Sequence, residues 1–84
     1  MIKKNIDVSL GGDETRPIAM LVQLASQFKS RIEIRQDNMV VNAKSIMGMM
    51  TLGLVQGQKL EIDVEGEDEE NAMLEMENFL THKN

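Results

Sequence analysis

Two segments of the chain alternate apolar and polar residues, and this alternation restricts the possible folds more than any other feature of the sequence. They read RIEIRQ at 31–36 and KLEIDVE at 59–65. Alternation at this period is typical of a β-strand with one face buried and one in solvent. In the second segment we expect Leu60, Ile62 and Val64 to point inward and Glu61, Asp63 and Glu65 to point outward. Strands with one apolar face need a cover on that side only.

Two shorter patterns predict further strands. Residues 6–10 read IDVSL, which alternates in the same way and indicates a half-buried strand. The segment MVVNA at 39–43 follows Asp37 and Asn38, a pair suited to a two-residue hairpin turn. We therefore expect 39–43 to return antiparallel to 31–36.

Three amphipathic segments are expected to cover this sheet. The first helix should follow Thr15 as its N-cap, with Pro17 in its first turn. The second is predicted over 45–54 and the third over 68–80. The first has an apolar face of Ile18, Leu21, Val22, Ala25 and Phe28, widened by Met20 and Leu24, and the third has Ala72, Met73, Met76, Phe79 and Leu80. The order βαββαβα predicts an α+β open-faced sandwich, a four-stranded antiparallel sheet with three helices on one face.

The distribution of charge excludes some classes of partner. Residues 1–44 carry seven basic and five acidic groups, a net of +2, whereas residues 45–84 carry two basic and nine acidic groups, a net of −7. Direct binding to nucleic acid is not expected, because phosphate binding needs a basic surface. The chain has no Trp or Tyr, so it also lacks a base-stacking platform.

Length and cysteine content favour a small intracellular domain. The 84 residues are expected to form one domain over 1–84, and the absence of cysteine fits a cytoplasmic location. No apolar run is long enough to cross a membrane, and polar residues interrupt the first 13 positions, where a signal peptide would need an apolar core.

Two features that suggest metal or acid–base chemistry have simpler interpretations. His82, the only histidine, lies near the end of the chain without an obvious partner. The acidic run EGEDEE at 65–70 lacks the Gly and Glu spacing of an EF-hand loop. Asp68, Glu69 and Glu70 are instead expected at a helix start, where negative charge is favoured by about 0.3–1 kcal/mol each.

The segment GGDETRP at 11–17 combines a glycine pair, two carboxylates and an arginine. Arg16 beside a helix N-terminus could bind an anion. Asp13 and Glu14 compete for the same positive end, so a capped helix entry is the simpler interpretation. Nothing indicates a cleft or a reacting partner, and we expect no catalytic residue, no cofactor and no metal here.

The segment NAKSIMGMM at 42–50 has more apolar residues than a short helix can bury. Ser45 is a suitable N-cap, and Met49 with Leu52 can fill the core. Ile46, Met47 and Met50, here called the apolar patch, can then share the side turned away from the sheet. Exposed methionine adapts to varied partners, so a binding surface is expected.

The sequence NAKSIMG at 42–48 resembles the regulatory-serine motif of the HPr phosphocarrier proteins of the sugar phosphotransferase system. Further matches cover nearly the whole chain: Gly12, Arg16 and Pro17 in the active-loop frame, Leu52 and Gly57 at the end of the second helix, and EGEDEENA at 65–72 at the entry to the third. The resemblance implies the HPr fold. The family's active loop reads Gly-x-His-Ala-Arg-Pro, and Glu14 stands where the phosphoryl-accepting histidine would be.

Loss of that histidine with retention of the serine is similar to the catabolite repression HPr (Crh) subset of the family. In that subset an HPr kinase/phosphorylase modifies the serine, and the modified protein is a corepressor for catabolite control protein A. The resemblance therefore implies that Ser45 is phosphorylated and that a regulator of this type is a partner. Arg16, Lys44 and the apolar patch are the expected partner contacts.

Two other functions remain open at this point. The chain could be a phosphocarrier that uses an unusual residue, or an HPr-like interaction module that is never phosphorylated and binds through the apolar patch alone. A regulatory, non-enzymatic phosphoprotein is the first choice, because the motif around Ser45 is intact and the histidine position is not.

Overall fold

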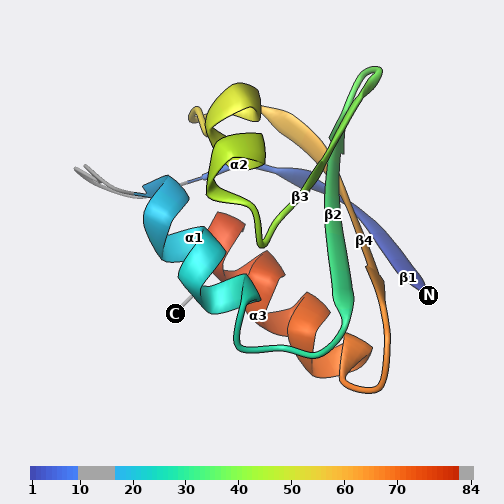
Figure 1. Ribbon diagram of the computed structural model, residues 1–84. Coiled ribbons are helices and arrows are strands. Elements are labelled where there is room, and N and C mark those ends of the chain that lie inside the picture. The colour runs from blue at the N-terminus through green and yellow to red at the C-terminus, as the bar shows by residue number, and fades with distance from the viewer. Residues whose placement is uncertain (10–16, 82–84) are drawn as a thin grey trace.

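A four-stranded antiparallel sheet lies on one side of the molecule and three helices lie on the other, within the parts of the chain that the structure describes (Figure 1). The computed structural model describes residues 1–9 and 17–81. In chain order the elements are β1 (Ile2–Asp7), α1 (Pro17–Ala25), β2 (Arg31–Gln36), β3 (Met39–Asn42), α2 (Ile46–Leu52), β4 (Lys59–Glu65) and α3 (Glu69–Thr81). The predicted α+β fold and its βαββαβα order are confirmed.

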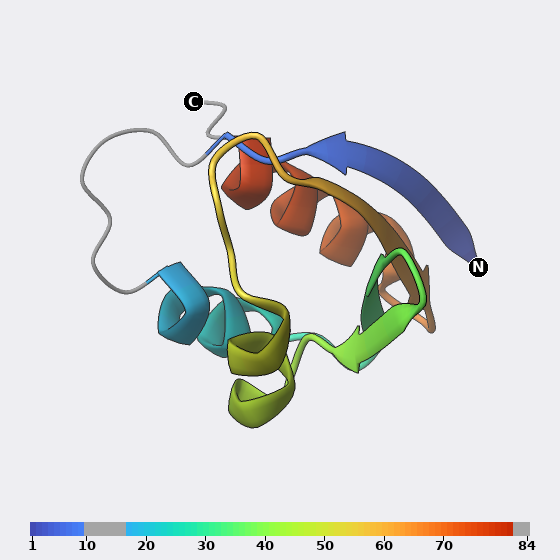
Figure 2. The same cartoon turned by 90° about the horizontal axis from the view of Figure 1, so that it is seen from above.

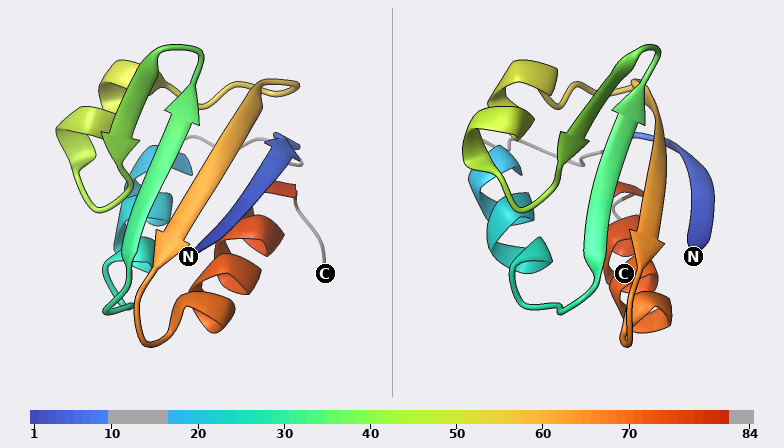
Figure 3. Two further views of the ribbon diagram at one scale, coloured as in Figure 1. Left: turned by 90° about the vertical axis from the view of Figure 1, so that its right-hand side faces the viewer. Right: turned by 45° about the vertical axis from the view of Figure 1, so that its right-hand side comes forward.

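The strands lie in the order β1-β4-β2-β3, so the last strand of the chain is in the interior of the sheet (Figure 3). β4 pairs antiparallel with β1 on one side and with β2 on the other. This register aligns Ile62 with Ile34 and Leu60 with Ile6. Apolar side chains thus meet across the strands on the face that the helices cover.

The core lies between this face and the helices (Figure 2). α3 packs against β1 and β4, α2 contacts β3, and α1 contacts both other helices. The largest fully buried side chains come from all these layers: Leu21, Ile32, Ile34, Met49, Ile62, Met73, Met76 and Leu80. Burying a side chain of this size contributes about 1.5–3 kcal/mol, which explains why the apolar periodicity predicts these elements.

Several element boundaries agree with the patterns, and one differs for a local reason. β2 and β4 cover 31–36 and 59–65 as predicted, and α3 ends one residue after the predicted Leu80. α2 ends at Leu52 rather than 54, because Gly53 has φ = 75° and donates its N–H to the carbonyl of Met49. A glycine adopts positive φ without strain from a Cβ, which lets the chain leave the helix at this point.

The first strand and the first helix differ from the prediction. β1 begins at Ile2, four residues before the predicted start, because the polar run Lys3, Lys4 and Asn5 gives no alternation of apolar and polar residues. Leu10, predicted to belong to this strand, lies outside the described residues. Met20 was expected to widen the buried face of α1 but is exposed. Leu21 and Ala25 form the buried line of this helix, and the preceding position is rotated about 100° away from it.

The burial of Asp63 also differs from the prediction. Asp63 points to the helix-free face as predicted, yet only 5% of its surface is exposed. Lys3 on β1 and Glu33 on β2 are its cross-strand partners, and Arg35 Nη2 lies 3.7 Å from its Oδ2. Neighbours on both sides cover a polar residue in the middle of a sheet, even on the face that has no helices.

Candidate functional site

Ser45 immediately precedes α2 and closes its first turn. Its backbone is extended, with φ = −104° and ψ = 115°, and its Oγ accepts a hydrogen bond from the N–H of Gly48 at 3.1 Å. Its carbonyl accepts the N–H of Met49 at 3.0 Å. This is the geometry of a serine N-cap, so the predicted cap is confirmed.

Gly48 leaves space for the Ser45 side chain. A Cβ at this position would lie 3.3 Å from Ser45 Oγ and 3.4 Å from Val41 Cβ. Because 3.3 Å is shorter than an ordinary contact, Ser45 would have to move by a few tenths of an ångström to accept that Cβ. The glycine of the NAKSIMG motif therefore keeps one side of the serine hydroxyl unobstructed.

The turn that carries Ser45 is tied to the connection between α1 and β2. Asn42 accepts the N–H of Lys44 on its side-chain oxygen at 2.8 Å and the N–H of Ser45 on its carbonyl at 2.9 Å. Lys44 Nζ donates to the carbonyl of Phe28 at 2.7 Å. The sequence predicts Lys44 as a partner contact, whereas the structure gives its ammonium group an internal acceptor.

The apolar patch is exposed as the sequence predicts. Met47 is 76% exposed, Met50 is 65% exposed and Ile46 is 43% exposed, whereas Met49 and Leu52 on the same helix are buried. No residue of α2 is charged. Ser45 therefore adjoins an uncharged apolar surface on α2, the helix that lies beside α1 (Figure 2).

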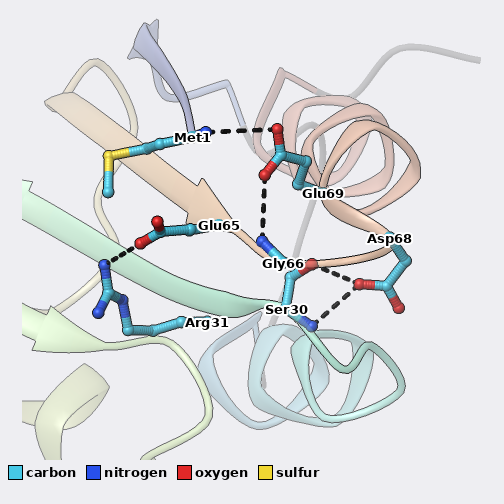
Figure 4. Close-up of polar contacts among 7 residues, drawn as sticks. All are labelled: Met1, Ser30, Arg31, Glu65, Gly66, Asp68 and Glu69. Atoms are coloured by element: carbon cyan, nitrogen blue, oxygen red, sulfur yellow. Dashed lines mark hydrogen bonds and ion pairs between the residues drawn. The ribbon is translucent and has the colours of Figure 1, made fainter.

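The acidic segment 65–70 spans the junction of β4 and α3, and the carboxylates of Glu65, Asp68 and Glu69 contact other residues of the chain (Figure 4). Asp68 accepts the backbone N–H groups of Lys29 and Ser30 at 2.9 Å each, and the Ser30 hydroxyl also donates to it. These hydrogen bonds, the one from the Ser30 hydroxyl first, lower the pKa of Asp68 to about 2. Glu69 accepts the N–H of Gly66, and this hydrogen bond lowers the pKa of Glu69.

This junction is structural. Within residues 1–9 and 17–81, no group of three acidic or histidine side chains is arranged to hold a metal ion. Gly66 has φ = 154°, and a Cβ there would lie 2.6 Å from Ser30 Cα, so the two loops approach too closely for any other residue. The ion pair of Arg31 with Glu65 at 2.6 Å is exposed and contributes little. No pattern in the sequence indicated that Ser30 binds Asp68.

The helix-free face of the sheet carries a second group of charged residues. Arg35 lies between the carboxylates of Glu61 and Asp63, at 3.6 Å and 3.7 Å. Hydrogen bonding to Asp63, together with desolvation, raises the pKa of Glu61, while the charges of Lys3 and Arg35 oppose that rise. Arg35 and Glu61 also line a surface pocket with the ion pair of Lys59 and Asp7, so the charges around this pocket are largely paired with one another.

Arg16, the remaining predicted partner contact, lies outside the described residues. The same holds for Glu14 at the histidine position, for the expected N-cap Thr15 and for His82, which was not expected to form a site. Among the helices that are described, none is long and apolar enough to cross a membrane.

Comparison with known proteins agrees with the motif and the fold. The family described as "PTS HPr component phosphorylation site" matches residues 5–82. The chain is 45% identical to the HPr-like protein Crh of Halalkalibacterium halodurans over 87% of this chain and 88% of the relative. It is 42% identical to the phosphocarrier protein HPr of Treponema pallidum over 99% of this chain and 96% of the relative. The crystal structure of the phosphocarrier protein HPr from Bacillus anthracis str. Ames superposes with a TM-score of 0.87 at 38% identity, covering 95% of this chain and 96% of that one. The chain therefore belongs to the HPr family.

Proposed function

We propose that this protein is a regulatory HPr-like phosphoprotein of the cytoplasm, phosphorylated on Ser45 by an HPr kinase/phosphorylase. In this role it is a corepressor for a regulator similar to catabolite control protein A, and it catalyses no reaction itself. One observation carries the proposal. Ser45, the serine of the NAKSIMG motif, lies directly beside an exposed and uncharged apolar patch.

The residue at position 14 favours regulation over phosphoryl transfer. Similarity alone does not separate the two functions, because relatives named Crh and relatives named HPr match at comparable identity. A histidine phosphocarrier needs an imidazole nitrogen as acceptor, and Glu14 offers only a carboxylate at the matching position. The serine motif, in contrast, is complete.

The structural context of Ser45 supports a switch that changes charge and leaves the fold intact. A phosphoserine adds a charge of about −1.5 to −2 and three acceptor oxygens. The turn is already held by Asn42 and by the bond from Lys44 to Phe28, and neither contact uses the Ser45 hydroxyl. The new charge would adjoin the apolar patch, so a partner with a basic pocket beside an apolar groove would bind both. Arg16 and Lys44 are proposed to flank this surface.

The test has two steps. HPr kinase/phosphorylase and ATP should add one phosphoryl group to the protein and none to Ser45→Ala, as measured by intact mass. Both forms are then titrated into the regulator by calorimetry. Two charge-assisted hydrogen bonds of about 1.5 kcal/mol each would raise the affinity on the order of a hundredfold. Equal affinities would leave Ser45 with the role of a helix cap only.

The competing phosphocarrier function has its own assay. With phosphoenolpyruvate and the general phosphotransferase enzyme, the protein should form no acid-labile phosphoryl group. Glu14→His should accept weakly, because Arg16 and Pro17 of the loop are in place while Asp13 and Thr15 differ from the family pattern. Stoichiometric labelling of residues 11–17 in the unaltered protein would contradict the regulatory proposal.

A further inference from the structure

The eight methionines of the chain divide into two groups by exposure. Met49, Met73 and Met76 are buried in the core, and the other five, Met1, Met20, Met39, Met47 and Met50, are exposed. The two most exposed, Met47 and Met50, both belong to the apolar patch. The surface beside Ser45 is thus built largely from thioethers that solvent can reach.

Exposure decides which methionines an oxidant in solution attacks. Hydrogen peroxide transfers one oxygen atom to the thioether sulfur: the sulfur lone pair attacks one oxygen, the S–O bond forms as the O–O bond breaks, and the leaving hydroxide takes the proton of the transferred oxygen and departs as water. The product is a sulfoxide, which is polar where the thioether was apolar. Met47 and Met50 are accessible to this attack, whereas Met49, on the same short helix, is covered.

We infer that Met47 and Met50 are a reversible oxidation site through which peroxide makes most of the apolar patch polar without unfolding the protein. The consequence for partner binding rests on the proposed function, because that function makes the patch a contact surface. The fold should persist, since the three core methionines are shielded and the Ser45 cap uses the backbone N–H of Gly48 rather than any side chain of the patch. Methionine sulfoxide reductases reverse the change: two thiols become a disulfide, and the sulfoxide oxygen leaves as water.

The oxidation site is tested on the protein alone. After timed exposure to hydrogen peroxide, peptide mass spectrometry should show Met47 and Met50 oxidised at least about ten times faster than the three core methionines. Far-UV circular dichroism should stay unchanged, and retention on a hydrophobic-interaction column should fall. Reductases for both sulfoxide epimers with dithiothreitol should restore the retention. Equal oxidation of Met49 and Met47, or loss of the circular dichroism signal, would overturn the inference.

Matched variants assign the effect to the patch. In the double variant Met47→Leu/Met50→Leu, peroxide should lower column retention much less than in the unaltered protein, because leucine keeps the apolar surface and cannot form a sulfoxide, whereas Met1, Met20 and Met39 still can. Met39→Leu removes an exposed methionine on β3, and its retention should still fall with peroxide. If the double variant loses as much retention as the unaltered protein, the oxidised surface lies elsewhere and the inference is wrong.

A binding measurement then tests the consequence for regulation. Ser45-phosphorylated protein is titrated into the regulator before and after oxidation, and the oxidised form should bind at least about ten times more weakly. Equal affinities of the two forms would contradict a redox effect on binding. If the unoxidised phosphoprotein does not bind either, the proposed function fails, and mass spectrometry and column retention still decide the oxidation site.

Discussion

Two single substitutions, Met49→Ala and Met50→Ala, should differ strongly in their effect on the free energy of unfolding. Met49 is fully buried and Met50 is 65% exposed, although they are neighbours on one helix. Truncating a buried methionine costs about 2–5 kcal/mol, from lost burial and from the cavity that remains. Met50→Ala should change the free energy of unfolding by no more than about 0.5 kcal/mol, because solvent already surrounds the side chain.

The predicted loss is large relative to the whole stability. At about 0.05–0.15 kcal/mol per residue, a chain of 84 residues has a free energy of unfolding of about 4–13 kcal/mol. With an m-value of about 2 kcal/mol/M, Met49→Ala should lower the guanidinium chloride midpoint by about 1–2.5 M. The midpoint for Met50→Ala should move by about 0.25 M or less.

The assay is far-UV circular dichroism, because the chain has no Trp or Tyr to report unfolding by fluorescence. Both variants should keep the m-value of the unaltered protein, which shows that they unfold from the same compact state. Met47→Ala is the matched control on the exposed side. A loss of 2 kcal/mol or more in Met50→Ala, as large as in Met49→Ala, would refute the division of α2 into a core side and a free side.

Three further changes test the contacts around the site and the acidic junction. Ser45→Ala should lower the free energy of unfolding by about 0.5–2 kcal/mol through loss of the cap, and an unchanged denaturant midpoint would contradict that role. Asp68 has a folded pKa of about 2 against 3.8 for the free group, so its stabilising contribution is complete above pH 3.8 and is lost as the pH falls through about 2. Asp68→Asn should make stability measured between those pH values less pH-dependent, and an unchanged acid profile would count against the assignment. Gly66→Ala should destabilise by more than about 1–3 kcal/mol, because it adds a clash with Ser30 to backbone strain, whereas Gly57→Ala adds strain without a contact within 4 Å and should cost less in the same denaturation assay.

Periodicity predicted those parts of the fold in which a single element buries its own apolar side chains. β2, β4 and α3 each carry enough apolar residues to define a face, and their predicted boundaries agree closely with the structure. β1 carries too few, because only Ile2 and Ile6 are apolar on the face that the helices cover, and Lys4 between them pairs with Glu77 of α3. The burial of Asp63 likewise depends on which strands flank β4, and strand order cannot be read from one strand's sequence.

The candidate site follows the same division. The Ser45 cap and the exposure of Met47 and Met50 were predictable, since they depend on positions within one short helix. The bond from Lys44 to Phe28 joins segments 16 residues apart, and the bonds from Ser30 to Asp68 span 38 residues. Contacts of that range require the tertiary fold, so no local pattern indicated them.

The position of β4 between β1 and β2 also determines when the sheet can be completed during synthesis. Asp7 and Lys59, at the near ends of β1 and β4, are 52 residues apart in the chain. At about 5–20 residues per second, a ribosome needs roughly 3–10 s to make the residues between them. Throughout that time β1 has no strand to pair with. Its lysines, Lys3 and Lys4, lower the tendency of such an unpaired strand to join the β-structure of another chain. The same lysines that interrupt the alternation pattern of β1 therefore protect it against pairing with another chain until β4 has been made.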